Sequence, residues 1–273
     1  MTAPVTSPSA DLAYQCALVT GASSGLGVEY ARQLAPACES MILVARREDL
    51  LHQLAEDLRQ CWPGLVVHCL NVDLTLEADR HSLFAWMEQK KLVPDLLVNN
   101  AGMGDYGEFS SAEWPKLDAM LQVNVTALTH LCHGVLPAMI ASGRGNIINV
   151  SSLASALPIP DFTVYAATKA YVTSFSEALR MELRDFDIPV LAVCPGPVHT
   201  GFGKVAMRMT DADGIPSREG FYTEPEVVVA ESIRALRADK ARVYPGWKIA
   251  LLAAGISILP MAVIRAVQIG RRS

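Results

Sequence analysis

The sequence predicts an α/β fold, in which a doubly wound parallel sheet of about seven strands is flanked by helices on both faces. Short apolar runs, often β-branched, alternate along the chain with longer stretches of helical periodicity. These runs are apolar throughout, which is typical of parallel strands buried on both faces. With 273 residues, 51% of them hydrophobic, the chain is long enough for one large core.

The expected elements follow one another in strict alternation. Strands are expected at residues 17–20, 41–45, 65–70, 96–98, 146–150 and 190–194, and crossover helices at 48–60, 76–90, 117–141 and 165–186. A helix at 224–238 and a short strand at 242–244 would complete the sheet. Because crossovers between parallel strands are right-handed, this order predicts a Rossmann-type sheet that binds ligands at the carboxyl ends of its strands.

Composition argues against several kinds of partner. The net charge is only −5 and the basic residues are scattered, so no nucleic-acid partner is expected. The six cysteines form no CxxC pair and no metal-ligand spacing. We therefore expect reduced thiols, a cytoplasmic location and no metal site. His130 and His133 flank Cys132, but they lie on one predicted helix without a third well-placed ligand.

A glycine cluster follows the first strand. It reads Thr20-Gly21-Ala22-Ser23-Ser24-Gly25-Leu26-Gly27 and opens a helix. Glycines allow a sharp turn and close approach to a pyrophosphate, and a helix amino terminus offers free N–H groups. The spacing is GxxxGxG, whereas the common dinucleotide motif is GxGxxG. Such a cluster alone is often only a tight turn, but its place after the first strand favours a dinucleotide site.

Tyr165 and Lys169 lie four residues apart on an expected helix, so their side chains are neighbours. A tyrosine with its usual pKa of about 10 is a poor acid–base group at neutral pH. A nearby ammonium stabilises the phenolate, so we expect Lys169 to lower the pKa of Tyr165. In isolation a YxxxK pair is usually structural.

Along residues 16–200, further polar or glycine-containing motifs each follow the end of an expected strand, as the glycine cluster does. Asp73 follows the third strand, Asn99-Asn100-Ala101-Gly102 the fourth, Ser151-Ser152 the fifth and Pro195-Gly196 the sixth. In this series the chain resembles the short-chain dehydrogenase/reductase family. The resemblance implies an oxidoreductase that transfers hydride between a nicotinamide and a carbonyl or alcohol. It also implies a homo-oligomer, either a dimer or a tetramer.

The resemblance also implies the roles of individual residues. Ser152, thirteen residues before Tyr165 and therefore favoured over Ser151, would hold the substrate oxygen. Asn124 would anchor a water near Lys169, and Lys169 would bind the nicotinamide ribose. The implied catalytic residues are Asn124, Ser152, Tyr165 and Lys169. The implied cofactor-binding residues are Gly21, Ser23, Ser24, Gly25, Leu26, Gly27, Arg46, Asp73, Leu74, Asn100, Ala101, Gly102, Tyr165, Lys169, Pro195, Gly196, Val198 and Thr200.

Three residues near these motifs need separate comment. Thr168 replaces the serine usual in the family before the lysine, a mild change. Ser155 stands where a glycine is frequent, and we expect it to narrow the pocket entrance. His199 follows Val198 in the loop after the sixth strand, a position without a catalytic role in the family, and we interpret it as a loop residue.

The end of the second strand predicts the dinucleotide. NAD-selective sites place a carboxylate here for the ribose 2′-hydroxyl, whereas NADP needs a cation for its 2′-phosphate. Ala45 stands at the position of that carboxylate and Arg46 follows it. A guanidinium donates paired hydrogen bonds to phosphate oxygens. We therefore expect NADP(H) as cofactor, bound through Arg46; the alternative is that Arg46 and Arg47 are merely solvated residues opening a helix.

The substrate pocket is expected between residues 154–163 and 202–222. Both segments are rich in apolar residues, which favours a hydrophobic carbonyl compound, although the same residues are also compatible with a buried wall. The alternative function is a non-catalytic NADP(H)-binding redox sensor or scaffold. The presence of all four implied catalytic residues argues against it.

The two ends of the chain are expected to differ. Residues 1–13 predict a flexible arm and 14–246 a single catalytic domain. Residues 247–273 predict an apolar extension packed on that domain, capping the pocket or forming a subunit interface. Its sixteen uncharged residues fall short of the roughly twenty in a membrane-spanning helix. A peripheral membrane contact, with Arg265, Arg271 and Arg272 at the headgroups, and a true span are the alternatives.

Overall fold

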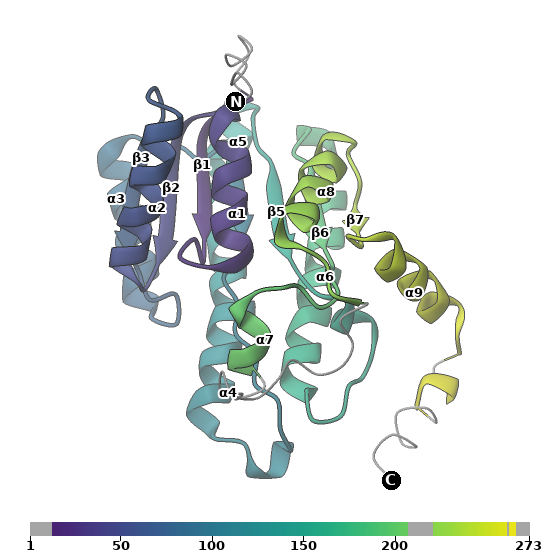
Figure 1. Ribbon diagram of the computed structural model, residues 1–273. Coiled ribbons are helices and arrows are strands. Elements are labelled where there is room, and N and C mark those ends of the chain that lie inside the picture. The colour runs from purple at the N-terminus through teal and green to yellow at the C-terminus, as the bar shows by residue number, and fades with distance from the viewer. Residues whose placement is uncertain (1–12, 207–220, 261, 266–273) are drawn as a thin grey trace, which may run out of the picture.

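The computed structural model describes residues 13–206, 221–260 and 262–265. Seven strands form one parallel sheet in the order β3-β2-β1-β4-β5-β6-β7 (Figure 1). The order reverses between β1 and β4, where a ligand crevice is expected. The predicted doubly wound sheet is therefore confirmed. The strands are β1 (Tyr14–Thr20), β2 (Cys38–Ala45), β3 (Val66–Asn71), β4 (Leu96–Asn99), β5 (Ile147–Val150), β6 (Val190–Val193) and β7 (Arg242–Val243).

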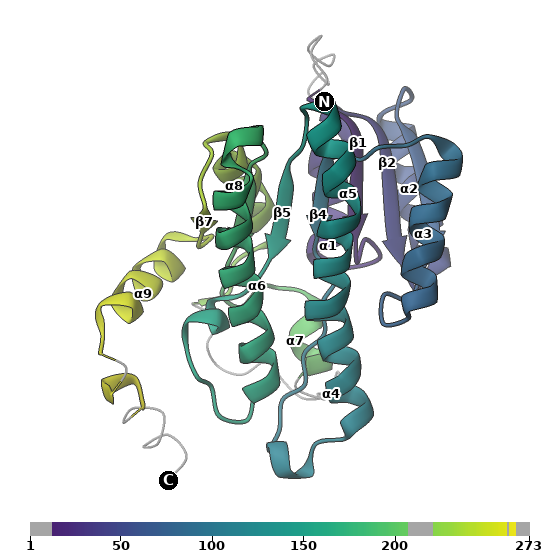
Figure 2. The same ribbon diagram turned by 180° about the vertical axis from the view of Figure 1, so that it is seen from behind.

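Helices cover both faces of the sheet. Helices α1 (Gly25–Leu34), α2 (Glu48–Cys61) and α8 (Pro225–Arg237) lie on the face seen in Figure 1. Helices α3 (Glu77–Lys90), α5 (Leu128–Ser142) and α6 (Thr163–Glu182) lie on the face seen in Figure 2. The neighbouring β1 residues Leu18 and Val19 belong to the cores on opposite faces. This double burial explains why the strand sequences are apolar throughout.

The long helix expected at 117–141 contains a distortion. Helix α4 (Trp114–Leu121) continues through a π-helical segment, η3 (Gln122–Ala127), into α5. By length and composition Trp114–Ser142 is the one helix among the described residues that is long and apolar enough to cross a membrane. Its α5 side chains, including Leu131 and Val135, pack in the core against the sheet, which accounts for this apolar composition.

Short helices complete the connections between the main elements. The interior strands β1 and β2 begin earlier than expected, at Tyr14 and Cys38, because these two residues are also buried. The short elements are η1 (Ala35–Ala37), η2 (Phe109–Ser111), η4 (Leu153–Ala156), η5 (Arg184–Phe186) and α7 (Gly201–Ala206).

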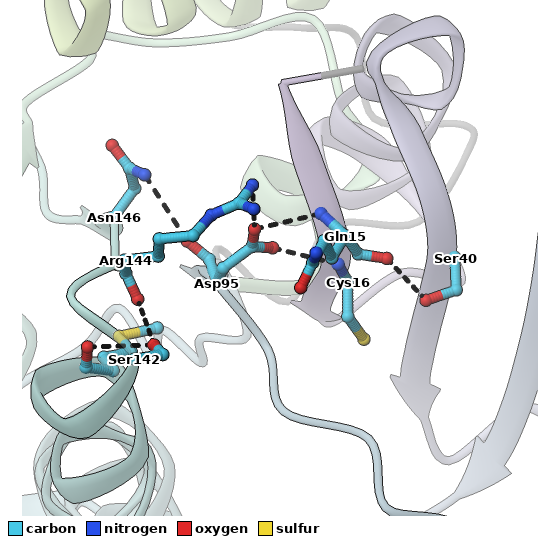
Figure 3. A network of polar contacts seen from close by, with 8 residues as sticks. Gln15, Cys16, Ser40, Asp95, Ser142, Arg144 and Asn146 are labelled. Atoms are coloured by element: carbon cyan, nitrogen blue, oxygen red, sulfur yellow. Dashed lines mark hydrogen bonds and ion pairs between the residues drawn. The ribbon is translucent and has the colours of Figure 1, made fainter. Parts of the chain in front are cut away.

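Asp95 links several elements at the amino ends of the strands, the side of the sheet opposite the glycine loop. Its carboxylate accepts hydrogen bonds of 2.9 Å from the backbone N–H groups of Gln15 and Cys16 (Figure 3). It also forms an ion pair of 3.2 Å with Arg144, and its carbonyl accepts a hydrogen bond from Asn146. Asp95 thus connects the start of β1 to β4 and to the turn after α5.

The final helix, α9 (Trp247–Ile258), follows β7 and extends away from the sheet (Figures 1 and 2). Ile249 and Ala253 are its buried residues. The packing of residues 247–273 on the catalytic domain stays a prediction; within the described residues, Ile249 of α9 lies against Gly196. Residues 1–12 of the expected flexible arm lie outside the described part of the chain.

Candidate active site

The glycine loop at the end of β1 has a backbone that only glycine accommodates. Gly21 and Gly25 have positive φ angles of 66° and 54°. A Cβ added to Gly27 would collide with the carbonyl oxygen of Gly21, and one on Gly25 would lie 3.1 Å from the Thr200 side chain. The loop is therefore tightly folded against itself and close to the loop after β6.

The end of β4 holds the glycine loop in place. The Asn100 side chain donates to the carbonyl of Thr20 at 2.9 Å. The buried Thr20 hydroxyl accepts hydrogen bonds of 3.0 Å from the N–H groups of Asn100 and Ala101. Asn99 instead donates to Asn149 on β5 at 2.9 Å. The predicted Asn100 and Ala101 thus brace the loop, and Thr20 is a supporting residue that we did not single out from the sequence.

The start of α1 suits an anionic group. Ser24 is the N-cap residue, is exposed, and makes no side-chain hydrogen bond to the helix. The amino-terminal N–H groups of a helix attract phosphate. Leu26 packs its side chain against the core below. Together with the side-chain-free loop surface at Gly21, this arrangement fits the pyrophosphate of a nicotinamide dinucleotide.

Two exposed arginines follow β2, but the structure distinguishes between them. Arg47 donates from Nη2 and Nε to the Ser23 hydroxyl, at 3.0 and 3.2 Å. Arg46 is exposed beside it. Arg46 alone is the residue predicted to bind the 2′-phosphate. Arg47, which was not predicted, reaches the glycine loop.

Asp73 and Leu74 follow β3 as expected. The Asp73 carboxylate accepts hydrogen bonds from the backbone and hydroxyl of Thr75, at 3.0 and 2.8 Å, so it is held in a local turn. Leu74 is buried and lines a small recess together with Thr20 and Ala101. Both residues therefore lie beside the glycine loop.

Tyr165 lies in the first turn of α6 and is almost fully buried. Burial raises the pKa of Tyr165 to about 12, and a hydrogen bond with Ser152 opposes that rise. Ser151 is turned the other way, because its hydroxyl donates to the carbonyl of Lys169 at 2.8 Å and bonds to Thr173 at 2.7 Å. The structure thus brings Ser152, and not Ser151, to Tyr165.

Lys169 lies one turn further along α6, with its Nζ 5.7 Å from the centre of the Tyr165 ring. Nζ donates to the carbonyl of Val150, at the end of β5, at 2.9 Å. Burial lowers the pKa of Lys169 to about 8, and nearby Cys194 partly opposes this. We expected Lys169 to lower the pKa of Tyr165. In this structure the burial of both groups dominates, and each is driven toward its neutral form.

Asn124 lies in the π-helical segment, where distortions often mark functional sites. Its Oδ1 accepts from the N–H of Met103 at 2.8 Å, and its Nδ2 donates to the Met103 carbonyl at 2.9 Å and to the Thr168 hydroxyl at 3.0 Å. A Cβ added to Gly102 would lie 3.4 Å from both Asn124 Oδ1 and Lys169 Nζ. Asn124 and Lys169 therefore approach the same point.

Aromatic rings surround Tyr165 on the substrate side. Phe162 stacks on Tyr165 with ring centres 4.2 Å apart, and Phe202 of α7 lies 5.7 Å away. Tyr106 contacts Phe162 at 5.9 Å, and its N–H donates to the carbonyl of Ala206 at 2.7 Å. The expected pocket segment 202–222 is described only at its two ends, because 207–220 lie outside the described residues.

The loop after β6 connects the site to its surroundings. The carbonyl of Pro195 accepts from Leu153 N–H at 2.8 Å, and Val198 forms a bridge with Thr223. The Thr200 side chain lies so close to Gly25 that a Cβ on Gly25 would be 3.1 Å from it. Gly196 has no room for a Cβ, because Ile249 of α9 occupies that space. The predicted residues of this loop thus lie between the glycine loop and α9.

Two further residues lie near the site. The hydroxyl oxygen of Ser155 is buried, and its expected narrowing of the pocket entrance stays a prediction. His199 stacks on Tyr222, with ring centres 4.6 Å apart, and its Nε2 lies 3.7 Å from Glu224, in keeping with its interpretation as a loop residue.

The histidines and cysteine of α5 also point in different directions. His130 accepts a hydrogen bond from Arg80 at 3.2 Å, whereas Cys132 is buried beside Asn99. Within the described ranges no three His, Cys, Asp or Glu side chains are grouped as metal ligands would be.

Comparisons with known proteins agree with this geometry. A model of the "short chain dehydrogenase" family matches residues 15–210. Sulfoacetaldehyde reductase 2 of Chromohalobacter salexigens is 34% identical over 80% of this chain and 85% of its own length. The very-long-chain 3-oxoacyl-CoA reductase of Mus musculus is 32% identical over 75% of this chain, but the match spans only 65% of that protein.

Solved structures give the same result. A short-chain dehydrogenase from Sphingobium yanoikuyae, in complex with NADPH, superimposes with a TM-score of 0.78 and 30% identity, over 89% of this chain and 92% of the other. The bulky-bulky ketone specific alcohol dehydrogenase from Comamonas testosteroni superimposes with a TM-score of 0.75 and 27% identity, over 89% and 90%.

Proposed function

Because the chain belongs to the short-chain dehydrogenase/reductase family, we propose that it reduces a hydrophobic carbonyl compound with NADPH, or catalyses the reverse reaction. Family membership makes it an oxidoreductase of CH–OH and C=O groups and confirms the predicted class. The observation that supports the proposal best is the meeting of Ser152, Tyr165 and Lys169 beneath a wall of aromatic rings.

Each of these side chains has a distinct task. The nicotinamide, when bound, supplies or accepts the hydride. The Tyr165 hydroxyl donates its proton to the carbonyl oxygen during reduction, and the Ser152 hydroxyl holds that oxygen. Lys169 supplies positive charge close to Tyr165 and stabilises the phenolate that remains. Asn124, held by the backbone of Met103, positions the proton supply to Lys169.

The choice of NADP(H) over NAD(H) rests on Arg46 and Arg47. Both are exposed after β2, and Arg47 already bonds Ser23 of the glycine loop. A 2′-phosphate would offer each guanidinium a better acceptor than a serine hydroxyl. The NADPH complex of the similar Sphingobium protein supports the same choice.

Dissociation constants test this choice of cofactor. Arg46→Ala and Arg47→Ala should each weaken NADPH binding about tenfold and leave NADH binding unchanged, because only NADPH carries the extra phosphate. Arg32→Ala on α1, whose arginine pairs only loosely with Asp57 at 4.0 Å, is the matched control. Equal affinities of the wild type for NADPH and NADH would contradict the assignment.

The aromatic wall favours an apolar substrate. Phe162 and Phe202 present ring surfaces next to Tyr165, and Tyr106 extends this surface outward. The names of the relatives range from a reductase of sulfoacetaldehyde to one of very-long-chain 3-oxoacyl-CoA, so they do not by themselves choose the substrate. We base the hydrophobic preference on the residues of this chain.

A substrate panel tests the reaction. NADPH absorbance would be followed with ketones, aldehydes, quinones, steroids and 3-oxoacyl thioesters. Tyr165→Phe should lower turnover at least a thousandfold and leave NADPH binding intact, since only the proton donor is removed. Tyr171→Phe is the control, because Tyr171 lies on the same helix but bonds Thr129 outside the site. Turnover retained by Tyr165→Phe would refute the mechanism.

Assembly and location form part of the same proposal. Members of the family commonly form homo-oligomers, and we expect a dimer or tetramer in the cytoplasm, with a membrane contact through the C-terminal extension. Light scattering during size-exclusion chromatography measures the oligomeric state.

A further inference from the structure

Helix α9 exposes apolar side chains over most of its surface. Trp247, Leu251 and Ile258 are 70%, 64% and 82% exposed. Only Ile249 and Ala253 of this helix are buried. We use the name tail surface for the large exposed apolar residues of α9 and of the residues after it: Trp247, Leu251, Leu252, Ile258, Leu259 and Val263.

The preceding helix shows how different this is. Helix α8 buries Val228, Val229, Ile233 and Leu236 against the sheet, and its charged residues face outward. Most exposed positions of α9 are apolar instead, and Lys248 and Ser257 are its exposed polar residues. An exposed apolar surface of this kind usually marks a contact with a membrane or another protein.

Charge distinguishes the two kinds of partner. Residues 247–273 contain Lys248, Arg265, Arg271 and Arg272 and no Asp or Glu. This segment therefore carries +4 in a chain of net charge −5, which leaves −9 on residues 1–246. Pairing two copies tail to tail would bring like charges together. An anionic lipid surface offers both an apolar layer and negative headgroups.

We propose that the tail surface docks on an anionic lipid bilayer, with its apolar side chains at the acyl boundary and the described cations Lys248 and Arg265 at the headgroups. The helix lies along the interface and does not cross it. Twelve residues of α9 span about 18 Å, whereas the hydrocarbon core is about 30 Å thick. Pro260 stands two residues after the end of the helix and prevents its simple continuation.

The position of α9 relates the bilayer to the active site. Ile249 fills the space beside Gly196, so the first turn of α9 is fixed against the loop after β6. The free end of α9 lies on the side to which the carboxyl ends of the strands point (Figures 1 and 2). In a docked molecule the active site would therefore lie on the side nearer the lipid. The site would then be close to substrates dissolved in the membrane, an inference that rests on the function proposed above.

Vesicle flotation of the full chain tests the docking without an activity assay. Wild-type protein should float with vesicles containing 30% phosphatidylglycerol at least tenfold more than with pure phosphatidylcholine, and 1 M salt should reduce this difference. L251E/I258E should abolish flotation. The control L76E/M181E makes the same charge change at two exposed apolar residues of the body and should float like the wild type. Both variants should keep NADPH affinity, which shows that they are folded.

Two results would overturn the proposal: no flotation of the wild type with either vesicle, or equal loss of flotation in the control variant. If the wild type does not float and L251E/I258E dissociates a wild-type oligomer, the tail surface is assigned to a second copy of the chain. Tyr165→Phe should float normally even if it is inactive, so a failure of the docking and a failure of the proposed reaction can be told apart.

Discussion

Buried polar groups are bonded differently at the two ends of the strands. We call the side of the sheet at the amino ends of the strands the amino edge, and the side at their carboxyl ends the carboxyl edge. At the amino edge, the Asp95 carboxylate accepts hydrogen bonds from two backbone N–H groups and pairs with Arg144. At the carboxyl edge, the buried ammonium of Lys169 donates to the single carbonyl of Val150, and no carboxylate pairs with it in the described part of the chain. Asp95 thus has several bonding partners, whereas the charge of Lys169 is poorly compensated.

The difference in bonding indicates that Asp95 contributes to the stability of the fold, whereas Lys169 and Tyr165 contribute to reactivity. The loss of a buried carboxylate that bonds two backbone N–H groups and an arginine should mainly destabilise the fold. Buried groups with displaced pKa values, such as Tyr165 and Lys169, are typical of catalytic sites. Substitutions at the two edges should therefore have different consequences.

The largest effect on stability is expected from Asp95→Ala. It leaves the N–H groups of Gln15 and Cys16 without their acceptor and should lower the free energy of unfolding by about 4 kcal/mol. Urea unfolding measures this change. Asp57→Ala is the control, because Asp57 is exposed and 4.0 Å from Arg32, and it should cost less than about 1 kcal/mol. A similar cost for both variants would contradict the structural role of Asp95.

Lys169→Met should change how stability depends on pH. The pKa of Lys169 is about 8 in the folded protein and near 10.5 when unfolded, so the fold carries an unfavourable buried charge below pH 8. As the pH rises from 8 to 10.5, the folded protein loses this proton first and the wild type gains stability relative to the variant. The gain approaches about 3 kcal/mol.

Urea unfolding of both proteins at pH 7.5 and 10 measures this gain. An unfolding difference that is the same at both pH values would show that Lys169 is not desolvated in the folded protein. The variant should also lose turnover, because the positive charge beside Tyr165 is removed.

The smallest effect is expected from Thr168→Val. It removes the acceptor of Asn124 Nδ2 and the hydrogen bond to the Tyr165 carbonyl, at a cost of about 1 kcal/mol. We expect kcat to fall several-fold while KM changes little, and Thr168→Ser to restore it. Thr129→Val on α5 is the control, since its hydroxyl bonds Val125 and Tyr171 away from the site. Equal kcat values in both valine variants would argue against a positioning role.

The fold and the family were predictable because they depend on local patterns. The buried strands appear as uninterrupted apolar runs, and each motif follows the end of a strand, where the sheet order brings them together. Ser152 was distinguishable from Ser151 by its spacing to Tyr165, and the structure turns Ser151 toward Thr173. The roles of the individual site residues stay predictions.

Other features depend on three-dimensional contacts that the sequence does not specify. The bond between Arg47 and Ser23 depends on how the glycine loop folds next to β2. The π-helical segment at Asn124 has no distinct hydrophobic period, so it was included in an ordinary helix. Burial among aromatic rings raises the pKa of Tyr165, and this burial is not visible in the spacing of Tyr165 and Lys169. Composition alone also did not show which side of α9 is covered.

The most direct test of the difference between the two edges measures turnover and urea unfolding on the same two variants. Tyr165→Phe should lose at least a thousandfold in kcat while its unfolding free energy stays within about 1 kcal/mol of the wild type. Asp95→Asn should lower the unfolding free energy by at least about 2 kcal/mol and keep kcat within a few-fold at a temperature where it is folded. If Tyr165→Phe kept its turnover, or Asp95→Asn lost turnover while folded and NADPH-bound, the assignment of reactivity to the carboxyl edge alone would be wrong.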